Sequence, residues 1–365
     1  MVLVNDILSY FEEIAPFSSQ EDYDNSGLLV GNLNAEVKGV LVCLDCTDEV
    51  VHDAVRLGCN LIVSHHPLIF KGLKSLTGKN YLERALITCI KNEINLISVH
   101  TNLDNALNGV NAEIGERIGL QNLQILEPKE NVILKLEVFV PSDSLEKLNS
   151  ALFAAGAGNI GNYQECGFYS EGKGTFKPKQ GANPVVGEID KLSEVEEVKA
   201  EFIFSIHLKN KVLAALFTTH PYEEVAYNLL PLVNHNQTEG AGMIGELVDA
   251  VDEESFLAHI KAVFGCKTIR HTKLTGRMIK TVAFCGGSGS FLLPMAKRKN
   301  ADIYITSDFK YHEFFDAENQ ILIADIGHYE GEQFTSHLII ELIKKKFTTF
   351  AVHLTGINTN PINYF

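Results

Sequence analysis

The chain has 365 residues, of which 45% are hydrophobic and 21% charged, and a formal net charge of −15. This composition is that of a globular protein, which excludes a disordered or fibrous chain. At ~150 residues per domain the length predicts two to three domains. The acidic balance argues against a nucleic-acid or membrane partner, because attraction to phosphate groups needs positive charge.

The chain is expected to be cytoplasmic. No apolar run reaches the ~18 residues of a transmembrane helix. Residues 1–17 lack the basic start and the small-residue cleavage site of a signal peptide. Seven cysteines, an odd number in a long chain, do not indicate a disulfide framework. Cys43 and Cys46 have C-x2-C spacing without a second pair, so we expect them to be structural rather than zinc ligands.

Short β-branched runs alternate with helical periodicity from residue 40 onward. The predicted elements are strands at residues 40–44, 61–64 and 96–99 and helices at residues 48–57, 81–91 and 110–118. Thr47 is expected to cap the first helix, and Gly119 to follow the last. This β-α-β-α-β-α pattern predicts a mostly parallel sheet with helices on its faces.

A similar pattern recurs near the end of the chain. The predicted elements there are strands at residues 281–285, 303–306 and 321–324 and helices at residues 291–298 and 331–345. We therefore expect an α/β core made of two similar halves, residues 1–128 and 236–365.

Residues 129–235, between these halves, have a different character. They comprise strand-like runs at residues 131–140 and 201–207, helical runs at residues 142–155 and 222–230, and a glycine-rich stretch between them. A β-α-β-β-α-β order fits this pattern, which predicts an inserted α+β domain of the ferredoxin-like type.

The strongest local signal is Ser64-His65-His66-Pro67 at the end of a predicted buried strand. In open α/β sheets, ligands bind beyond the carboxyl ends of the strands. Imidazole groups there suit Zn, Fe, Ni or Cu, and sites that also contain carboxylates admit Mn. A pair of capping or hydrogen-bonding histidines is the alternative.

Two further strand ends strengthen the metal interpretation. Asp104 follows the strand at residues 96–99, and the strand at residues 321–324 leads to His328 and Glu332. These two residues are one helical turn apart, the spacing of helix-borne metal ligands. With His65 and His66, five ligands would meet at one sheet edge if the two halves share a sheet. Five ligands with two carboxylates suit two metal ions with open positions for water, rather than a closed structural zinc. Unrelated polar groups at strand ends are the alternative.

The motifs together resemble those of the GTP cyclohydrolase I type 2 homologue family, also called NIF-three-like, and the resemblance runs nearly end to end. In chain order they are Asp24-Asn25-Ser26-Gly27-Leu28-Leu29-Val30-Gly31, Asp45-Cys46-Thr47, Ser64-His65-His66-Pro67, His100-Thr101-Asn102-Leu103-Asp104, Cys285-Gly286-Gly287-Ser288-Gly289-Ser290, Gly327-His328-Tyr329-Glu330-Gly331-Glu332 and Asn358-Thr359-Asn360-Pro361.

The resemblance implies a dinuclear metal site and a particular assembly. The ligands carried over are His65, His66, Asp104, His328 and Glu332. The insert resembles the PII/CutA-like domain of long bacterial members, and the family implies a toroidal homohexamer whose metal sites face an internal cavity. Met243 departs from many relatives, which have an arginine there, and this weakens any argument for an anion contact at that position.

Other motifs allow two interpretations each. The turn at residues 286–290 could cradle phosphate with its backbone N–H groups or only join a strand to a helix. Asp308 and His312 either support the metal ligands or line the pocket. The alternative is that Asp308 caps a helix and His312 is a surface residue. His100 is expected to be a general acid or base, or to orient a ligand. His220 is assigned no chemistry.

The predicted function is metal-dependent hydrolysis of a nucleotide or related small substrate, with GTP cyclohydrolase activity as the family label. Two divalent ions per subunit (Zn, Mn, Fe, Co or Ni) would be bridged by Asp104 or Glu332 and would activate water. His100 or His312 would supply a proton. The competing hypothesis is a non-catalytic metal-binding scaffold, regulatory protein or metallochaperone, which would show no metal-dependent turnover.

Overall fold

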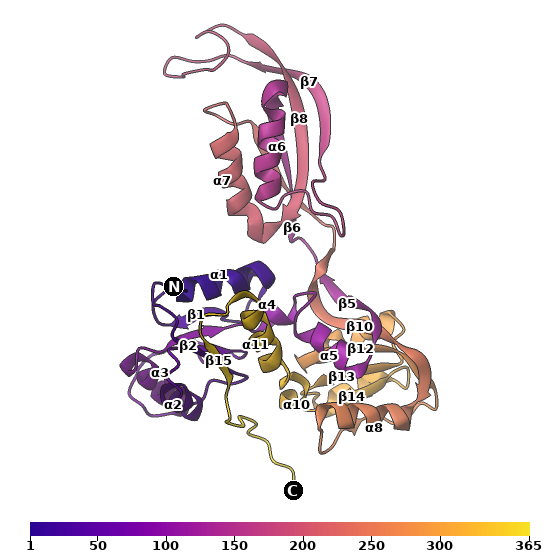
Figure 1. Cartoon of the computed structure of the whole chain (residues 1–365). Helices are drawn as coiled ribbons and strands as arrows, with labels where there is room; N and C mark the ends of the chain where they lie inside the picture. The colour runs from indigo at the N-terminus through magenta and orange to yellow at the C-terminus, as the bar shows by residue number, and fades with distance from the viewer. The chain divides into compact units, whose positions relative to one another are not determined.

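The computed structural model describes residues 1–365, which divide into two compact units. The core unit consists of Met1–Glu127 and Thr238–Phe365, and the inserted unit is Pro128–Gln237. Figure 1 shows both units, coloured by residue number along the chain. The insert expected at residues 129–235 lies within the second unit. No helix in either unit combines the length and apolar character that a membrane span requires.

The first sheet of the core unit has five strands and helices on both faces. In sheet order these strands are β1 (Gly27–Val30), β4 (Asn95–Ser98), β3 (Leu61–Ser64), β2 (Gly39–Cys43) and β15 (Ala351–Leu354). All neighbours are parallel except β1 with β4. Leu41 packs with α2 (Asp48–Arg56) and α3 (Tyr81–Lys91), whereas Val40 packs with α1 (Val4–Ile14) and α11 (Thr335–Lys346). The central strands are therefore buried on both faces, as in other parallel sheets.

The second sheet of the core unit has six strands. In sheet order these are β11 (Arg270–His271), β14 (Leu322–Asp325), β13 (Ile303–Ser307), β12 (Met278–Ser288), β10 (Asn236–Asp252) and β5 (Gln121–Lys129). Strands β12, β13 and β14 are parallel, and β10 and β11 run antiparallel to their neighbours β12 and β14. One face packs on α5 (Val110–Ile118) and α8 (Glu253–Phe264), and the other on α9 (Leu293–Arg298).

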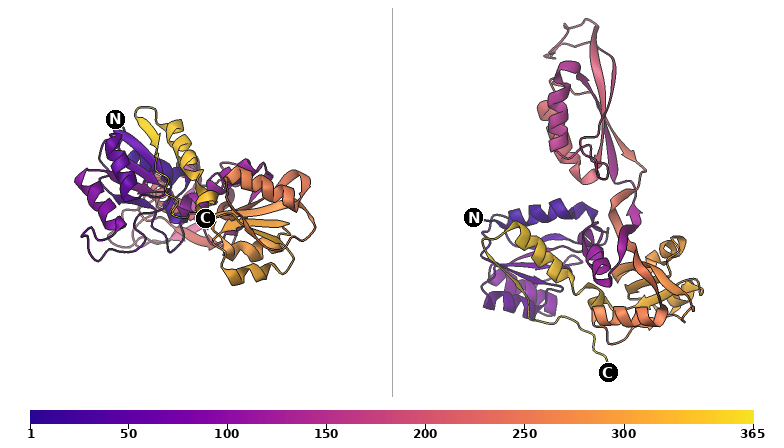
Figure 2. Two further views of the ribbon diagram at one scale, coloured as in Figure 1. Left: turned by 90° about the horizontal axis from the view of Figure 1, so that it is seen from below. Right: turned by 45° about the vertical axis from the view of Figure 1, so that its right-hand side comes forward.

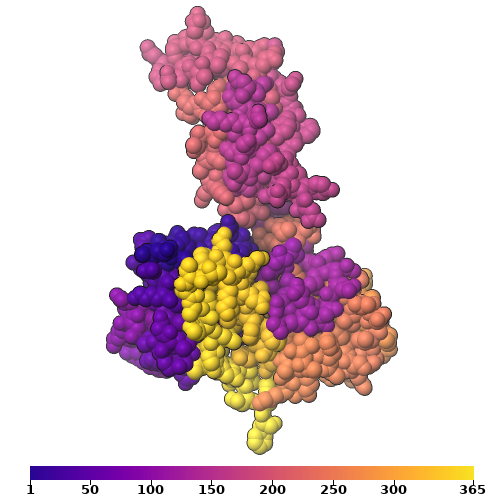
Figure 3. Space-filling view, viewed as in Figure 1, coloured from indigo at the N-terminus to yellow at the C-terminus, as the bar shows by residue number.

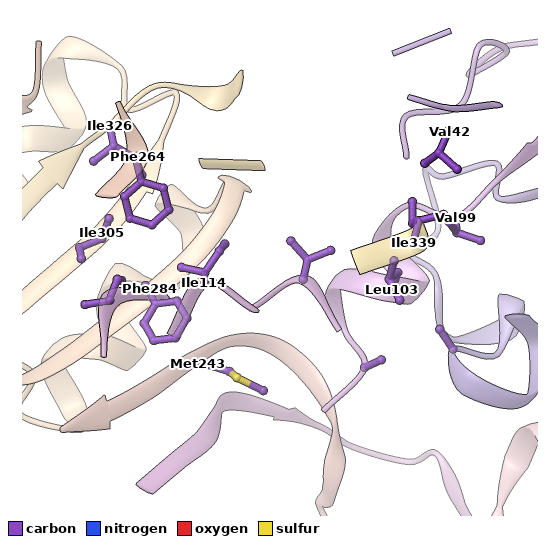
Figure 4. Packing of buried hydrophobic residues seen from close by; sticks show 14 of the residues in the cluster. Val42, Val99, Leu103, Ile114, Met243, Phe264, Phe284, Ile305, Ile326 and Ile339 are labelled. Carbon is purple, nitrogen blue, oxygen red and sulfur yellow. The ribbon is translucent and has the colours of Figure 1, made fainter. Parts of the chain in front are cut away.

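The strand ends that carry the candidate ligands lie in two sheets, so they do not meet at the edge of a single shared sheet. Each half adds one strand to the sheet of the other half, since β15 belongs to the first sheet and β5 to the second. Figure 2 (left) shows the purple and orange sheets as separate bodies. A continuous hydrophobic cluster joins them, and Figure 4 shows Val42 and Val99 of the first half and Phe284 and Ile305 of the second within it. In Figure 3 the yellow segment, which contains α11 and β15, lies between the indigo N-terminal part and the orange part of the core unit. The carboxyl ends of strands from both sheets border the same region.

The helix predicted at residues 331–345 is in fact two helices. A short α10 (His328–Glu332) precedes α11 (Thr335–Lys346). The side-chain amide of Gln333 donates to the carbonyl of Glu330, an oxygen that a continuous helix would pair with the backbone N–H four residues later. The break keeps His328 and Glu332 together on their own short helix.

The inserted unit is a four-stranded sheet covered by two helices. Its elements in chain order are β6 (Ile133–Pro141), α6 (Leu145–Ala154), β7 (Phe168–Phe176), β8 (Ser193–Ser205), α7 (Lys209–Thr219) and β9 (Tyr227–Leu232). The strand order is β7-β8-β6-β9, and every pair is antiparallel. Its hydrophobic cluster contains only residues of this unit.

The predicted helix at residues 222–230 is wrong, and the second helix of this unit is α7. His220 ends α7 in an extended conformation, φ −65° and ψ 136°, because the ring of the following Pro221 disfavours helical geometry. Residues Tyr227–Leu232 instead pair with β6, with Tyr227 opposite Val138. Pairing with a buried strand thus overrides the local helical pattern.

Candidate metal centre

The candidate metal centre is built from strand ends of both sheets of the core unit. Polar residues follow the carboxyl ends of five strands: Asp45 after β2, His65 and His66 after β3, His100 after β4, Asp308 after β13 and His328 after β14. The short helices α4 (Thr101–Asp104) and α10 add one carboxylate each. Ligand-type side chains meet here because parallel strands deliver their carboxyl ends to one side of a sheet.

Glu332 lies at the middle of the cluster, 2% exposed. Its Oε2 is 2.9 Å from Nε2 of His66 and 3.0 Å from Nε2 of His328. These two nitrogens are themselves 3.3 Å apart. One carboxylate oxygen and two imidazole nitrogens therefore face a common point.

The other oxygen of Glu332 faces a second group. Its Oε1 is 3.8 Å from Nε2 of His65, which is 3.6 Å from Oδ1 of Asp104. Both this nitrogen and this oxygen are buried without a hydrogen-bond partner. Buried polar atoms without partners are costly and uncommon, and a cation among these three residues would pair all of them. The residues present thus fit a metal ion.

Every histidine of the cluster has its Nδ1 atom held by an acceptor. The contacts are His65 to the carbonyl of Val99 at 2.9 Å, His66 to Asp45 at 2.7 Å, His100 to Asp24 at 2.8 Å and His328 to Asp308 at 2.7 Å. Because carbonyl and carboxylate oxygens only accept, each Nδ1 donates its hydrogen. The neutral imidazoles then carry a lone pair on Nε2, which is the arrangement of metal-bound histidines.

The electrostatics of the cluster also favour a cation. Burial opposes protonation of His66 and His328, but hydrogen bonds and charges of the adjacent carboxylates raise their pKa values to about 10 and about 11. Burial and the charge of Glu332 raise the pKa of Asp104 to about 8. Burial opposes ionisation of Glu332, yet the histidines hold its pKa well below the usual range. Without a metal ion, bound protons therefore neutralise the negative charge of the buried carboxylates.

Two of the supporting aspartates are fixed by further hydrogen bonds. Asp24 accepts from the backbone N–H groups of Asn25, at 2.7 Å, and Thr101, at 3.0 Å. Asp45 accepts from the hydroxyl of Thr359, at 2.7 Å, so the C-terminal segment reaches the site. Although burial opposes it, hydrogen bonds to the histidines lower the pKa of both carboxyls. These contacts orient the rings of His100 and His66.

The glycine turn at residues 286–290 touches the centre through its backbone. Gly287 has φ +62°, and a Cβ there would overlap Oε1 of Glu332. Its carbonyl accepts hydrogen bonds from the hydroxyls of Thr306, at 2.9 Å, and Ser307, at 2.5 Å. Only a short 3-10 turn and the six-residue α9 follow. These contacts favour the tight-turn interpretation, in which glycine lets the chain approach Glu332.

The structure brings most of the predicted site residues together. His65, Asp104 and Glu332 form one group whose ligand atoms lie within 4.8 Å of each other, and His66, His328 and Glu332 form another. His100 forms a third group with His65 and His66. Asp308 accepts a hydrogen bond from His328, which agrees with the interpretation that it supports a ligand rather than caps a helix.

His312 does not lie with these residues. It is on η5 (Tyr311–Ala317), where its ring contacts Tyr311 and Phe315, and it is absent from the lining of the cavity at the centre. We therefore withdraw the proton-donor role expected for it.

Comparison with known proteins places the chain in a family. Residues 2–361 match the sequence profile of Duf34/NIF3 (NGG1p interacting factor 3). The chain belongs to this family. It is 38% identical to the GTP cyclohydrolase 1 type 2 homolog of Halalkalibacterium halodurans over 98% of both chains, and 36% identical to that of Staphylococcus aureus strain MSSA476 over 99% of both. The crystal structure of a Bacillus cereus protein related to NIF3 superimposes with a TM-score of 0.85, at 38% identity, over 100% of this chain and 99% of the other.

Several residues that support the candidate ligands of this Duf34/NIF3 chain were assigned no role from the sequence. Asp24, Asp45 and Thr359 lie in the motifs that carried the family resemblance. The position of Asp45 could have indicated its role, because it comes two residues after the end of a fully buried strand. No such indication existed for Thr359, because its partner is 314 positions away.

Proposed function

We propose that the core unit holds two divalent metal ions with Glu332 as the shared ligand. The observation that carries this proposal is that Oε2 of Glu332 faces His66 and His328, while Oε1 faces His65 and Asp104. The sequence did not decide whether Asp104 or Glu332 bridges the two ions. In this proposal Glu332 is the bridging residue. Mixed imidazole and carboxylate ligands suit Zn, Mn, Fe, Co or Ni.

We propose further that this centre is the active site of a hydrolase for a nucleotide or related small molecule. Divalent ions there would act as Lewis acids and would lower the pKa of water toward neutrality. His100 is the residue best placed to transfer a proton, since its ring lies 5.2 Å from the rings of both His65 and His66. Asp24 holds its Nδ1 hydrogen, so Nε2 remains available to accept a proton and return it.

The name of the relatives supports the reaction class. Proteins that match this chain end to end are named GTP cyclohydrolase 1 type 2 homolog. Opening a purine ring is a hydrolytic step that begins with attack by water, so it is compatible with a centre of this kind. We carry over only this reaction class to the proposal.

We also propose that the chain is a cytoplasmic homohexamer whose inserted unit is a ferredoxin-like domain of the PII/CutA type. The β-α-β-β-α-β order and the strand order β7-β8-β6-β9 support the domain type. The hexamer rests on the family resemblance. Sedimentation of the purified chain would test it, and a monomer would refute it.

The test of function combines metal content with turnover. Protein purified without added metal is analysed for its elements, and the metal-loaded protein is screened against nucleosides, nucleotides and phosphoesters. We expect two ions per chain and a hydrolytic reaction that disappears when a chelator removes them. Two bound ions with no turnover of any substrate class would favour a non-catalytic scaffold, and the absence of metal would reject both.

A further inference from the structure

The cavity at the metal centre has an unusual wall. Its volume is about 740 Å3, within the range of small-molecule sites. Tyr329 and four exposed aromatic side chains line it, the exposed ones being Tyr23, Phe70, Tyr81 and Phe291. These four side chains are 47–69% exposed. Single exposed apolar residues are common on proteins, but four exposed rings around one cavity offer flat apolar surface to a ligand.

One of these rings is close to the metal ligands. The ring of Phe70 meets the ring of His100 edge to face, with centroids 5.8 Å apart. His100 in turn lies beside His65 and His66. A molecule stacked on Phe70 would therefore reach the groups proposed to carry the chemistry.

The charge of the wall restricts what this molecule can be. The lining contains the carboxylates of Glu21, Asp45, Asp104 and Glu332, and no lysine or arginine. Two divalent ions would cancel the charge of these four carboxylates and leave no positive surplus. A nucleoside triphosphate carries about four negative charges, and protein sites bind its phosphates with Lys, Arg, Mg²⁺ or helix N-termini. The cavity has no lysine or arginine for a chain of three phosphates, and the one N-cap residue of a long helix in its lining is Thr47, before α2.

We infer that this cavity binds an uncharged, planar heterocycle of the size of a nucleobase or nucleoside, held by its aromatic wall, and that it does not select for a triphosphate. The inference rests on the proposed function, since it names the substrate class of the same site. Stacking tolerates different bases because every base has a π face. The ions would then meet the ring itself rather than a phosphate tail.

The test measures binding of guanosine, adenosine and cytidine, and of their 5′-triphosphates, to the metal-loaded protein by calorimetry at two salt concentrations. At least one nucleoside should bind saturably, and its triphosphate should bind no more than about threefold tighter, with no strong salt dependence. Binding of a triphosphate more than about tenfold tighter, lost at high salt, would overturn the inference. So would the failure of all three nucleosides to bind.

Variants locate the binding surface. Phe70→Ala and Phe291→Ala should each weaken nucleoside binding by about tenfold, since stacking of one base contributes ~1–3 kcal/mol. Phe315→Ala is the matched control, because Phe315 is 65% exposed but lies outside the cavity. An equal effect of all three variants would contradict the inference. Metal content is measured on each sample. Two ions without nucleoside binding in the unmodified protein would reject the inference and leave the metal centre standing, whereas absence of the ions from that protein would reject the proposed function.

Discussion

The Nε2 atoms of His66 and His328 lie 3.3 Å apart, although the residues are 262 positions apart in the chain. Asp45 and Asp308 hold the opposite nitrogens of the two rings, so both Nε2 atoms present lone pairs to the same point when the rings are neutral. Two lone pairs at this separation repel each other unless a proton or a cation lies between them. The fold therefore positions these rings for a shared positive charge.

Single substitutions should distinguish the binding positions of the two proposed ions. Asp104→Asn and His328→Ala should each leave one ion bound, because each removes a ligand from one group only. Glu332→Gln should lose both, since both groups depend on it. Elemental analysis of the purified variants measures this. The control is Glu330→Gln, a buried carboxylate on the same short helix that belongs to neither group. Equal losses from Glu330→Gln and Glu332→Gln would contradict the bridging role.

Gly287→Ala should remove metal while leaving the fold intact. The new Cβ would overlap Oε1 of Glu332 and displace its carboxylate. The backbone strain of an alanine at φ +62° costs about 1–2 kcal/mol. Gly265→Ala carries the same strain at φ +64°, with nothing within 4 Å of its Cβ. Both variants should lose similar stability in urea, and only Gly287→Ala should lose metal. Full metal content in Gly287→Ala would show that the turn does not set the position of Glu332.

The inserted unit should become less stable below neutral pH because of His220. Its Nε2 donates to the carbonyl of Phe139 at 3.0 Å, and its Nδ1 accepts from the backbone N–H of Tyr222 at 3.1 Å, so the native ring is neutral. Burial lowers its pKa from 6.5. The unfolded chain then binds more protons than the native one just below pH 6.5, so the stabilisation is complete above that pH and is lost as the pH falls.

Replacement of His220 by glutamine tests this assignment. His220→Gln should lower the free energy of unfolding by about 1–2 kcal/mol at pH 8, where the hydrogen bonds of the neutral ring are lost. The difference between the two proteins should shrink toward pH 5. Urea unfolding followed by circular dichroism at several pH values measures it. A difference that is constant between pH 5 and pH 8 would rule out a titrating His220.

The metal centre should survive removal of the inserted unit. All proposed ligands and their supporting groups belong to the core unit, and the hydrophobic clusters of the two units share no residue. A chain with residues 128–237 replaced by a short Gly/Ser linker should fold and bind two ions, as measured by circular dichroism and elemental analysis. A folded product without metal would show that the insert contributes to the centre.

Local sequence was sufficient to locate the strand ends but not to place them in space. The strand Leu61–Ser64 and the helix Val110–Ile118 were predicted within their bounds because buried runs and capping residues are local signals. Separation of the core into two sheets depends on contacts between distant segments, which a single sequence does not display. The bridging position of Glu332 could not be distinguished from that of Asp104 for the same reason. The failure at residues 222–230 is similar, since β9 exists only by pairing with β6.

Strand β15 has a consequence for the order of events during synthesis. It pairs with β2, whose residues leave the ribosome some three hundred positions earlier. Until Ala351–Leu354 emerges, the edge of β2 presents unpaired backbone groups that can pair with another chain. The inserted unit is contiguous, so it can fold while the core unit is still incomplete. We therefore expect truncation before residue 351 to yield an aggregation-prone nascent chain with a folded insert.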